Sequence, residues 1–215
     1  MLPERSLDVR WFPKGARPTV VAVGILFAAA GCSGPESVKL TGVPATWYTV
    51  ITDAISEKPD VGSVGLLNSV GPCPLGNAIT VDGQQVTDVS DHGVVRLGGE
   101  IPAVLCSWYE GTPIEVTVAR ADDDAGYADL VTGARPRQQP GNQQTGQEIV
   151  VGPRTLQVVR TKYPTNPSAG TDFEAFYLDE ATRGRVSLRV SNSSERSAGY
   201  DETTVAADLA GFLNG

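Results

Sequence analysis

Only one histidine, His92, is available for acid–base or nucleophilic catalysis in this sequence. A Ser–His–Asp triad would have to use it, and it follows Ser90 and Asp91 directly. No serine lies in a Gly-x-Ser-x-Gly motif, and a histidine between Asp and Gly is more often an exposed loop residue. The sequence also contains no phosphate-binding loop, dinucleotide-binding motif or zinc-ligand cluster. We therefore assign no catalytic residue, no metal ligand and no cofactor.

Carboxylates are plentiful, but their spacing identifies no site. Asp122, Asp123 and Asp124 are contiguous, whereas the ligands of a calcium loop alternate with other residues. A helix capped by Asp122 is the better interpretation, because acids favour the positive end of a helix. The paired carboxylates of a glycoside hydrolase are brought together by the fold rather than by spacing, so a hydrolase of that kind stays an alternative.

Aromatic and basic side chains give two further candidates for binding. Three aromatic pairs could stack on a sugar or a lipid: Trp47/Tyr48, Trp108/Tyr109 and Phe176/Tyr177. Neighbours on a strand face opposite sides of a sheet, so we expect one member of each pair in the core. Arg183, Arg185 and Arg189 are predicted to form a basic stripe on the exposed face of the last strand, which is normally a solvated surface and at most a docking patch.

The first 31 residues have the layout of an export signal. Four basic side chains come first: Arg5, Arg10, Lys14 and Arg17. The apolar run 20–30 follows, and it is shorter than the roughly 20 residues that span a bilayer. It ends in AAGC at 29–32, which resembles the lipobox of bacterial lipoproteins. We predict a cleaved signal peptide over 1–31, lipidation of Cys32 and a tether over 32–46; a buried helix ending in Gly-Cys is the alternative.

The remaining cysteines, Cys73 and Cys106, allow a single intramolecular pairing. An exported chain folds in an oxidising compartment, where paired thiols persist as disulfides. A metal site is the weaker interpretation, because no second ligand lies at metal spacing from Cys73, and no C-x-x-C motif indicates a redox site. We predict a disulfide that closes a loop of about 34 residues and stabilises the fold by roughly 3–4 kcal/mol.

The charge balance excludes a general nucleic-acid binder. The chain has 17 Lys+Arg against 25 Asp+Glu, a net charge of −8, and phosphate contacts require clustered cations. Removal of residues 1–31 takes away four bases and two acids and leaves a net charge of −10. We expect the mature chain to be held at the membrane by lipid rather than by charge.

The periodicity of residues 47–215 predicts a single α+β domain with antiparallel sheet packed by a few helices. Strands are expected at 79–81 and 84–89, joined by the hairpin signal Asp82-Gly83, and at 94–97, 101–109, 114–119, 148–151, 155–163, 173–178 and 185–191. Helices are expected over 122–130 and, with Asp201 as N-cap, over 202–213. Residues 133–147 are rich in Gly and Pro and predict a loop, and 47–71 fit either helix or strand.

The two halves of the domain share an order of features. Each has an aromatic pair, a turn, an alternating strand and a Gly-Tyr before a helix. In the first half the pair is at 108–109, the strand at 114–119 and the Gly-Tyr at 126–127; in the second half they are at 176–177, 185–191 and 199–200. This order suggests a duplicated strand–strand–helix unit, and chance in an α+β protein is the alternative.

The assembled layout resembles the small envelope lipoproteins of actinobacteria, which combine a lipobox, a short tether and an α+β domain. One group of unknown function carries an early Cys and a later Cys next to Trp, as Cys73 and Cys106-Ser107-Trp108 do here. The resemblance implies a lipid anchor at the outer face of the cell membrane and carries over no catalytic residue. We expect a non-enzymatic module that binds a ligand or an envelope protein; the alternatives are a carboxylate hydrolase and a lipid carrier.

Overall fold

The computed structural model describes residues 43–57, 73, 75, 79–86, 91–98, 100–108, 114–193 and 199–214. The predicted signal peptide, Cys32 and Tyr109 lie outside these residues, as do the side chains of Asp91 and His92. Within the described part, no helix is both long enough and apolar enough to cross a membrane.

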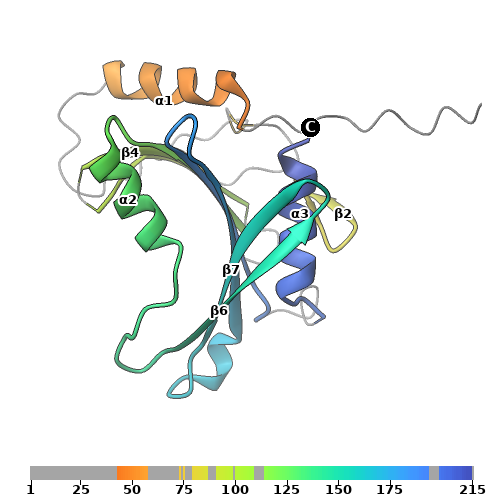
Figure 1. Ribbon diagram of the computed structural model, residues 1–215. Helices are drawn as coiled ribbons and strands as arrows, with labels where there is room; N and C mark the ends of the chain where they lie inside the picture. The colour runs from red at the N-terminus through yellow and green to blue at the C-terminus, as the bar shows by residue number, and fades with distance from the viewer. Residues whose placement is uncertain are drawn as a thin grey trace, which may run out of the picture. The chain divides into compact units, whose positions relative to one another are not determined.

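Seven strands form one fully antiparallel sheet in the order β3-β4-β5-β9-β8-β7-β6 (Figure 1). They are β3 (Asp91–Leu97), β4 (Ile101–Trp108), β5 (Ile114–Arg120), β6 (Gln143–Val151), β7 (Arg154–Lys162), β8 (Thr171–Asp179) and β9 (Gly184–Ser191). Within the described residues, three α-helices and a short 3-10 helix accompany them: α1 (Ala45–Glu57), α2 (Asp124–Gly133), α3 (Glu202–Phe212) and η1 (Pro167–Ala169). The predicted α+β class, with antiparallel sheet and a C-terminal helix, is confirmed.

A separate hairpin pairs β1 (Ile79–Val81) with β2 (Gln84–Val86). Its two turn residues, Asp82 and Gly83, have φ of 50° and 72°, the left-handed values that a two-residue hairpin turn requires. The Asp-Gly signal therefore predicted this turn for the right physical reason.

One face of the large sheet carries the main core, which α1, α3 and the β1–β2 hairpin cover. Trp108 and Leu188 of the sheet and Leu209 of α3 are fully buried there. Helix α3 begins as predicted, because the Asp201 carboxylate accepts a hydrogen bond of 2.8 Å from the backbone N–H of Thr204. The sequence left 47–71 undecided; residues 47–57 belong to α1, which begins at Ala45 inside the range assigned to the tether.

The predicted disulfide between Cys73 and Cys106 is present in this core. Both residues are at most 2% exposed. Cys106 lies on β4 between His92 of β3 and Val116 of β5 in the strand register. The bridge thus joins the segment that precedes the β1–β2 hairpin to the interior of the sheet.

In the described part of the chain, α2 covers one end of the opposite face. Leu130 of α2 packs against Ala103 of β4 and Ala119 of β5. The N-cap is Asp123 rather than the predicted Asp122, because the Asp123 carboxylate accepts from Gly126 N at 2.8 Å while the Asp122 carbonyl accepts from Arg183. Helices α2 and α3 lie on opposite faces of the sheet. The duplication suggested by the order of features stays a prediction.

The predicted loop 133–147 is shorter in the structure. Helix α2 extends to Gly133 and β6 begins at Gln143, so residues 134–142 form the connection. Residues 143–147 pair with β7. Because β6 is an edge strand with polar side chains on both faces, it lacks the alternation by which a half-buried strand is recognised.

Candidate ligand-binding site

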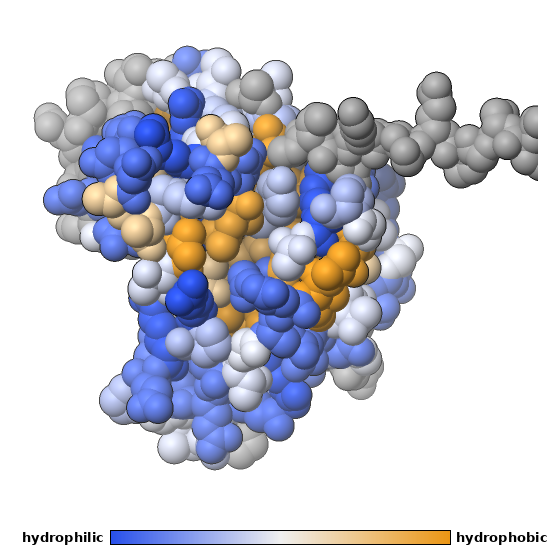
Figure 2. Space-filling view, viewed as in Figure 1, coloured by the Kyte–Doolittle hydropathy of each residue, from blue (hydrophilic) through white to orange (hydrophobic). Residues whose placement is uncertain are grey.

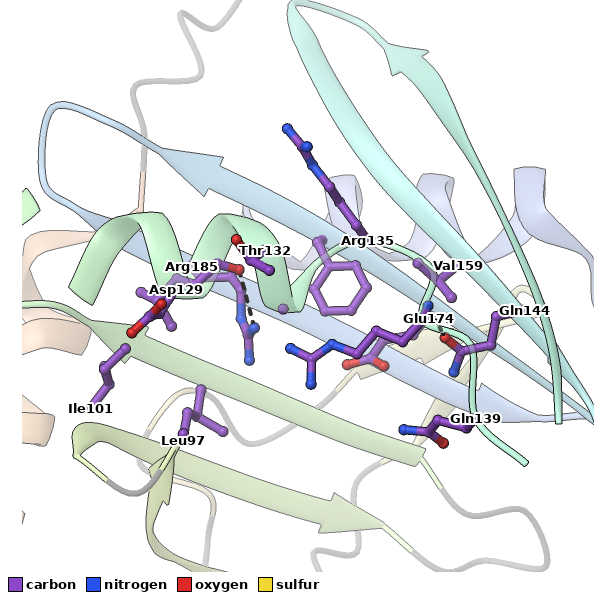
Figure 3. Close-up of a pocket in the computed structure, with 15 residues that line it drawn as sticks. Leu97, Ile101, Asp129, Thr132, Arg135, Gln139, Gln144, Val159, Glu174 and Arg185 are labelled. Atoms are coloured by element: carbon purple, nitrogen blue, oxygen red, sulfur yellow. Dashed lines mark hydrogen bonds between the residues drawn. The ribbon is translucent and has the colours of Figure 1, made fainter. Parts of the chain in front are cut away.

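A cleft of about 520 Å³ lies on the face that α2 covers in part. It is bounded by α2, by the connection 134–142 and by the sheet, and Figure 2 shows apolar side chains between α2 and the β6–β7 hairpin, bordered by hydrophilic ones. In Figure 3, Leu97 and Ile101 lie at one end of the cleft and Gln139 and Gln144 at the other. The volume falls within the roughly 300–1,000 Å³ of small-molecule sites.

The floor of the cleft follows from the alternation of the central strands. On β9, Arg185 and Ser187 face away from the core that Val186 and Leu188 enter. Glu174 and Phe176 of β8 share that face, because Phe176 pairs with Ser187 in the register. Of these side chains, which a half-buried sheet would expose to water, Arg185 contacts α2 and is buried, whereas Glu174 is half-buried.

Arg185 is the most enclosed charged group of the cleft, with 8% of its surface exposed. It donates to the Leu130 carbonyl of α2 at 3.4 Å and lies 5.4 Å from the centre of the Phe176 ring. Its Nε is buried without a hydrogen-bond partner among the described residues. Burial lowers the pKa of this guanidinium, and the nearby Glu174 carboxylate opposes that shift.

The prediction that Arg183, Arg185 and Arg189 form a solvent-exposed basic stripe on β9 is therefore wrong. Arg183 lies in the turn before β9, with φ of 54°, and donates to the Asp124 carboxylate at 2.7 Å. Arg189 binds the carboxylates of Glu115, at 3.2 Å, and of Asp172, at 3.1 Å from its Nε. The three arginines do not form one solvated surface, since α2 covers Arg185 and acids pair with the other two.

Arg137 reaches the cleft from the connection between α2 and β6. Its backbone N–H donates to Gln144 Oε1 at 2.6 Å, and a Cβ on Gly146 of β6 would come within 2.5 Å of the Pro136 ring. The glycine in β6 thus lets this connection approach the sheet closely. The same contacts fix the backbone from which the Arg137 side chain extends.

The guanidinium groups of Arg137 and Arg185 meet at the last residue of α2. A Cβ placed on Gly133 would lie 2.9 Å from Arg185 Nη1 and 3.3 Å from Arg137 Nη2. The two cations also interact electrostatically, which lowers the pKa of Arg185 further. No carboxylate of the described residues forms an ion pair with either guanidinium. The cleft therefore holds two adjacent positive charges that no described carboxylate pairs directly, although Glu174 attracts Arg185 at longer range.

Glu174 is the carboxylate on the cleft floor. Burial raises its pKa, whereas attraction to Arg185 and Arg189 and a hydrogen bond with Ser187 act in the opposite direction. The net effect is upward, so the neutral acid is favoured at higher pH than in water.

Replacing Glu174 by glutamine is expected to stabilise the fold at neutral pH and not below about pH 4. Because the pKa of Glu174 is higher in the folded than in the unfolded chain, stability is lost as pH rises from the unfolded pKa through the folded pKa. Glu174→Gln removes that loss, so its gain in Tm should grow over this pH range. Thermal unfolding at a series of pH values measures it, with the exposed Glu100→Gln as control. A gain that is equal at every pH would contradict the assignment.

A second hollow on the same sheet face contains the Arg189 cluster. Here Tyr163 donates to Asp172 at 2.6 Å, and the Asp172 carboxylate also accepts from Arg189. Because these groups pair with one another, the cluster is best explained as internal structure rather than as a ligand site.

The structure separates the residues that the sequence singled out. Cys73 and Cys106 lie on the core face, away from the cleft, and Trp108 is buried there. Phe176 is the member of its aromatic pair that lines the cleft, while Tyr177 packs at the edge of the main core. Over the described part of the chain, no three His, Cys, Asp or Glu side chains form a group that could hold a metal.

Sequence reasoning missed Arg137, Glu174 and Gln144. The only available signal was that Glu174 occupies a polar position of an alternating strand, on the same side as Asp172. Comparisons with family models, curated proteins and solved structures gave no match.

Proposed function

We propose that this chain is an envelope lipoprotein, anchored through Cys32, whose folded domain binds a small polar ligand in the cleft beneath α2. The observation that carries the proposal is the enclosure of Arg185 on the floor of that cleft. A buried cation without an ion-pair partner is costly to maintain, and a ligand that supplies hydrogen-bond acceptors would offset the cost. Cys32 and the preceding apolar run support the anchor.

The two alternative functions fit the cleft less well. A lipid carrier needs an apolar cavity, whereas this cleft is lined by Arg135, Arg137, Arg185, Asp129 and Glu174. A carboxylate hydrolase has one observation in its favour: Glu174 has the raised pKa that suits a general acid. We rank binding above hydrolysis because the unpaired arginines, rather than the carboxylates, distinguish this cleft.

Ligand stabilisation of the full chain, purified in detergent, tests the binding function. Glucose, glucuronate, glucose 6-phosphate and palmitate serve as probes, and unfolding is followed by tryptophan fluorescence. We expect at least one of the three polar probes to raise the Tm, because a ligand bound only to the folded state stabilises it by mass action. Gly133→Trp, which places a large side chain between the two guanidinium groups, should abolish that rise. Stabilisation by palmitate alone, or by none of the four, would contradict the proposal.

A further inference from the structure

We infer that the cleft recognises an organic anion that also carries hydroxyl groups, with its carboxylate or phosphate bound between Arg137 and Arg185 beside Gly133. This inference rests on the proposed function and deepens it by naming the ligand class. It depends on the positions of the two guanidinium groups, on the few hydrogen bonds that Arg185 makes, and on the polar side chains of the cleft floor next to them.

The first support is the convergence of two cations from distant parts of the chain. Arg185 comes from the centre of the sheet and Arg137 from the connection after α2, and a terminal nitrogen of each lies next to the position that a Cβ on Gly133 would occupy. Two guanidinium groups that face one site repel each other unless an anion lies between them. Planar, forked donors of this kind match the oxygens of carboxylates and phosphates.

The second support is the state of Arg185. A guanidinium has five N–H donors, yet within the described part of the chain Arg185 makes one hydrogen bond, to the Leu130 carbonyl, and its buried Nε has no partner. Arg154 and Arg160 also bury an unpaired Nε, but their terminal nitrogens bind Asn214 and Glu202. Arg185 is the one of these three that lines the cleft, so a ligand bound there would supply acceptors for its remaining terminal donors.

The third support is the contrast with Arg189 on the same strand. Arg189 is paired with two carboxylates of the protein, those of Glu115 and Asp172, and so needs no ligand anion. Arg185 occupies the equivalent alternating position nearer α2 and is left without such a pair. In a mature chain with a net charge of −10, attraction for an anion has to come from local groups of this kind rather than from the overall field.

The polar side chains on the cleft floor next to the arginines indicate that the rest of the ligand carries hydroxyl groups. Figure 3 shows Glu174 on the sheet between Arg185 at one side and Gln144 and Gln139 at the other. A carboxyl group at this position accepts hydrogen bonds from hydroxyl groups and disfavours a second negative charge. The cleft volume of about 520 Å³ leaves room for a hydroxylated body of sugar size behind the anionic group.

The test compares ligands that differ only in the anionic group. Calorimetric titration of the full chain in detergent uses glucuronate for the carboxylate, glucose 6-phosphate for the phosphate and glucose as the neutral match. We expect one of the two anions to bind at least tenfold more tightly than glucose, since a charge-assisted hydrogen bond contributes about that much to affinity. The anion that binds identifies which acid the site accepts.

Two variants and a charge-matched control locate the site. Arg137→Gln should weaken binding of the preferred anion about tenfold or more, and Arg185→Gln should do so at least as strongly. Arg137 is exposed, so its replacement tests the inference even if Arg185→Gln fails to fold. Lys162→Gln removes the same charge at an exposed position outside the cleft and should leave the affinity unchanged.

The outcomes separate this inference from the proposed function. If glucose binds as tightly as both anions and Gly133→Trp blocks it, the anion inference fails while the cleft remains a binding site. If an anion binds but Arg137→Gln and Lys162→Gln weaken it equally, the attraction is nonspecific and the inference also fails. If none of the three sugars binds, both proposals fail.

Discussion

Replacing Cys73 and Cys106 together by alanine is expected to lower the free energy of unfolding by about 3–4 kcal/mol. The bridge joins residues 33 positions apart, and in the chain-entropy model the loss reflects the extra conformations that the unfolded chain then gains. Such a loss is a large part of the roughly 5–15 kcal/mol by which domains are stable. Urea unfolding of the two proteins, monitored by tryptophan fluorescence, measures the difference.

The burial of the disulfide in the core also predicts that its removal destabilises the fold. Both sulfur atoms lie in the core, and Leu75, two residues after Cys73, is 4% exposed. Loss of the bridge would therefore leave a small void and release the segment that precedes the β1–β2 hairpin. The native chain unfolded in the presence of a reducing agent is the control and should match the double variant. A difference below about 1 kcal/mol would mean that the bridge does not constrain the unfolded chain as the entropy model requires.

Local signals in the sequence were sufficient for much of the fold. Asp82-Gly83 predicted a hairpin because these residues adopt the positive φ values of its turn. Asp201 and the apolar stripe of 202–213 predicted the last helix. The β9 alternation also correctly assigned Val186 and Leu188 to the core. Residues 143–147 were missed because this half of the edge strand buries neither face, so hydrophobic periodicity carries no information there.

Local signals in the sequence could not predict the candidate site, because the cleft forms only where α2 and the connection after it lie over the sheet. Alternation showed that Arg185 points away from the core, but not that α2 would lie over it. Arg137 reaches the same place only because Pro136 can pack against Gly146. The first contact joins residues 55 positions apart and the second joins residues 10 apart. Periodicity within one strand does not determine which element covers it.

The two faces of the sheet therefore have different roles. The face toward α1 and α3 is a continuous apolar core that includes the disulfide. The face toward α2 has a small apolar cluster around Leu130 and, beyond it, charged side chains such as Glu174 and Arg185 that are only partly paired. Substitutions on the first face should act mainly on stability, and substitutions in the cleft mainly on binding.

Replacing Cys32 by alanine is expected to release the exported chain from the membrane completely. The proposed anchor is acylation of Cys32, and several acyl chains on one residue hold a protein stably where a single chain binds only marginally. Charge offers no substitute: the chain after residue 31 has 13 bases against 23 acids, and membrane surfaces that carry anionic lipid repel it. Metabolic labelling with a clickable fatty acid, followed by membrane fractionation, should find label and protein in the membrane for the native chain only.

The matched control is Cys73→Ala, which removes a cysteine of the disulfide and leaves Cys32 in place. It should weaken the fold and still carry label, so that loss of anchoring is separated from loss of stability. Fatty-acid label that persists on the Cys32→Ala chain would refute the anchor, as would membrane retention of that chain without label.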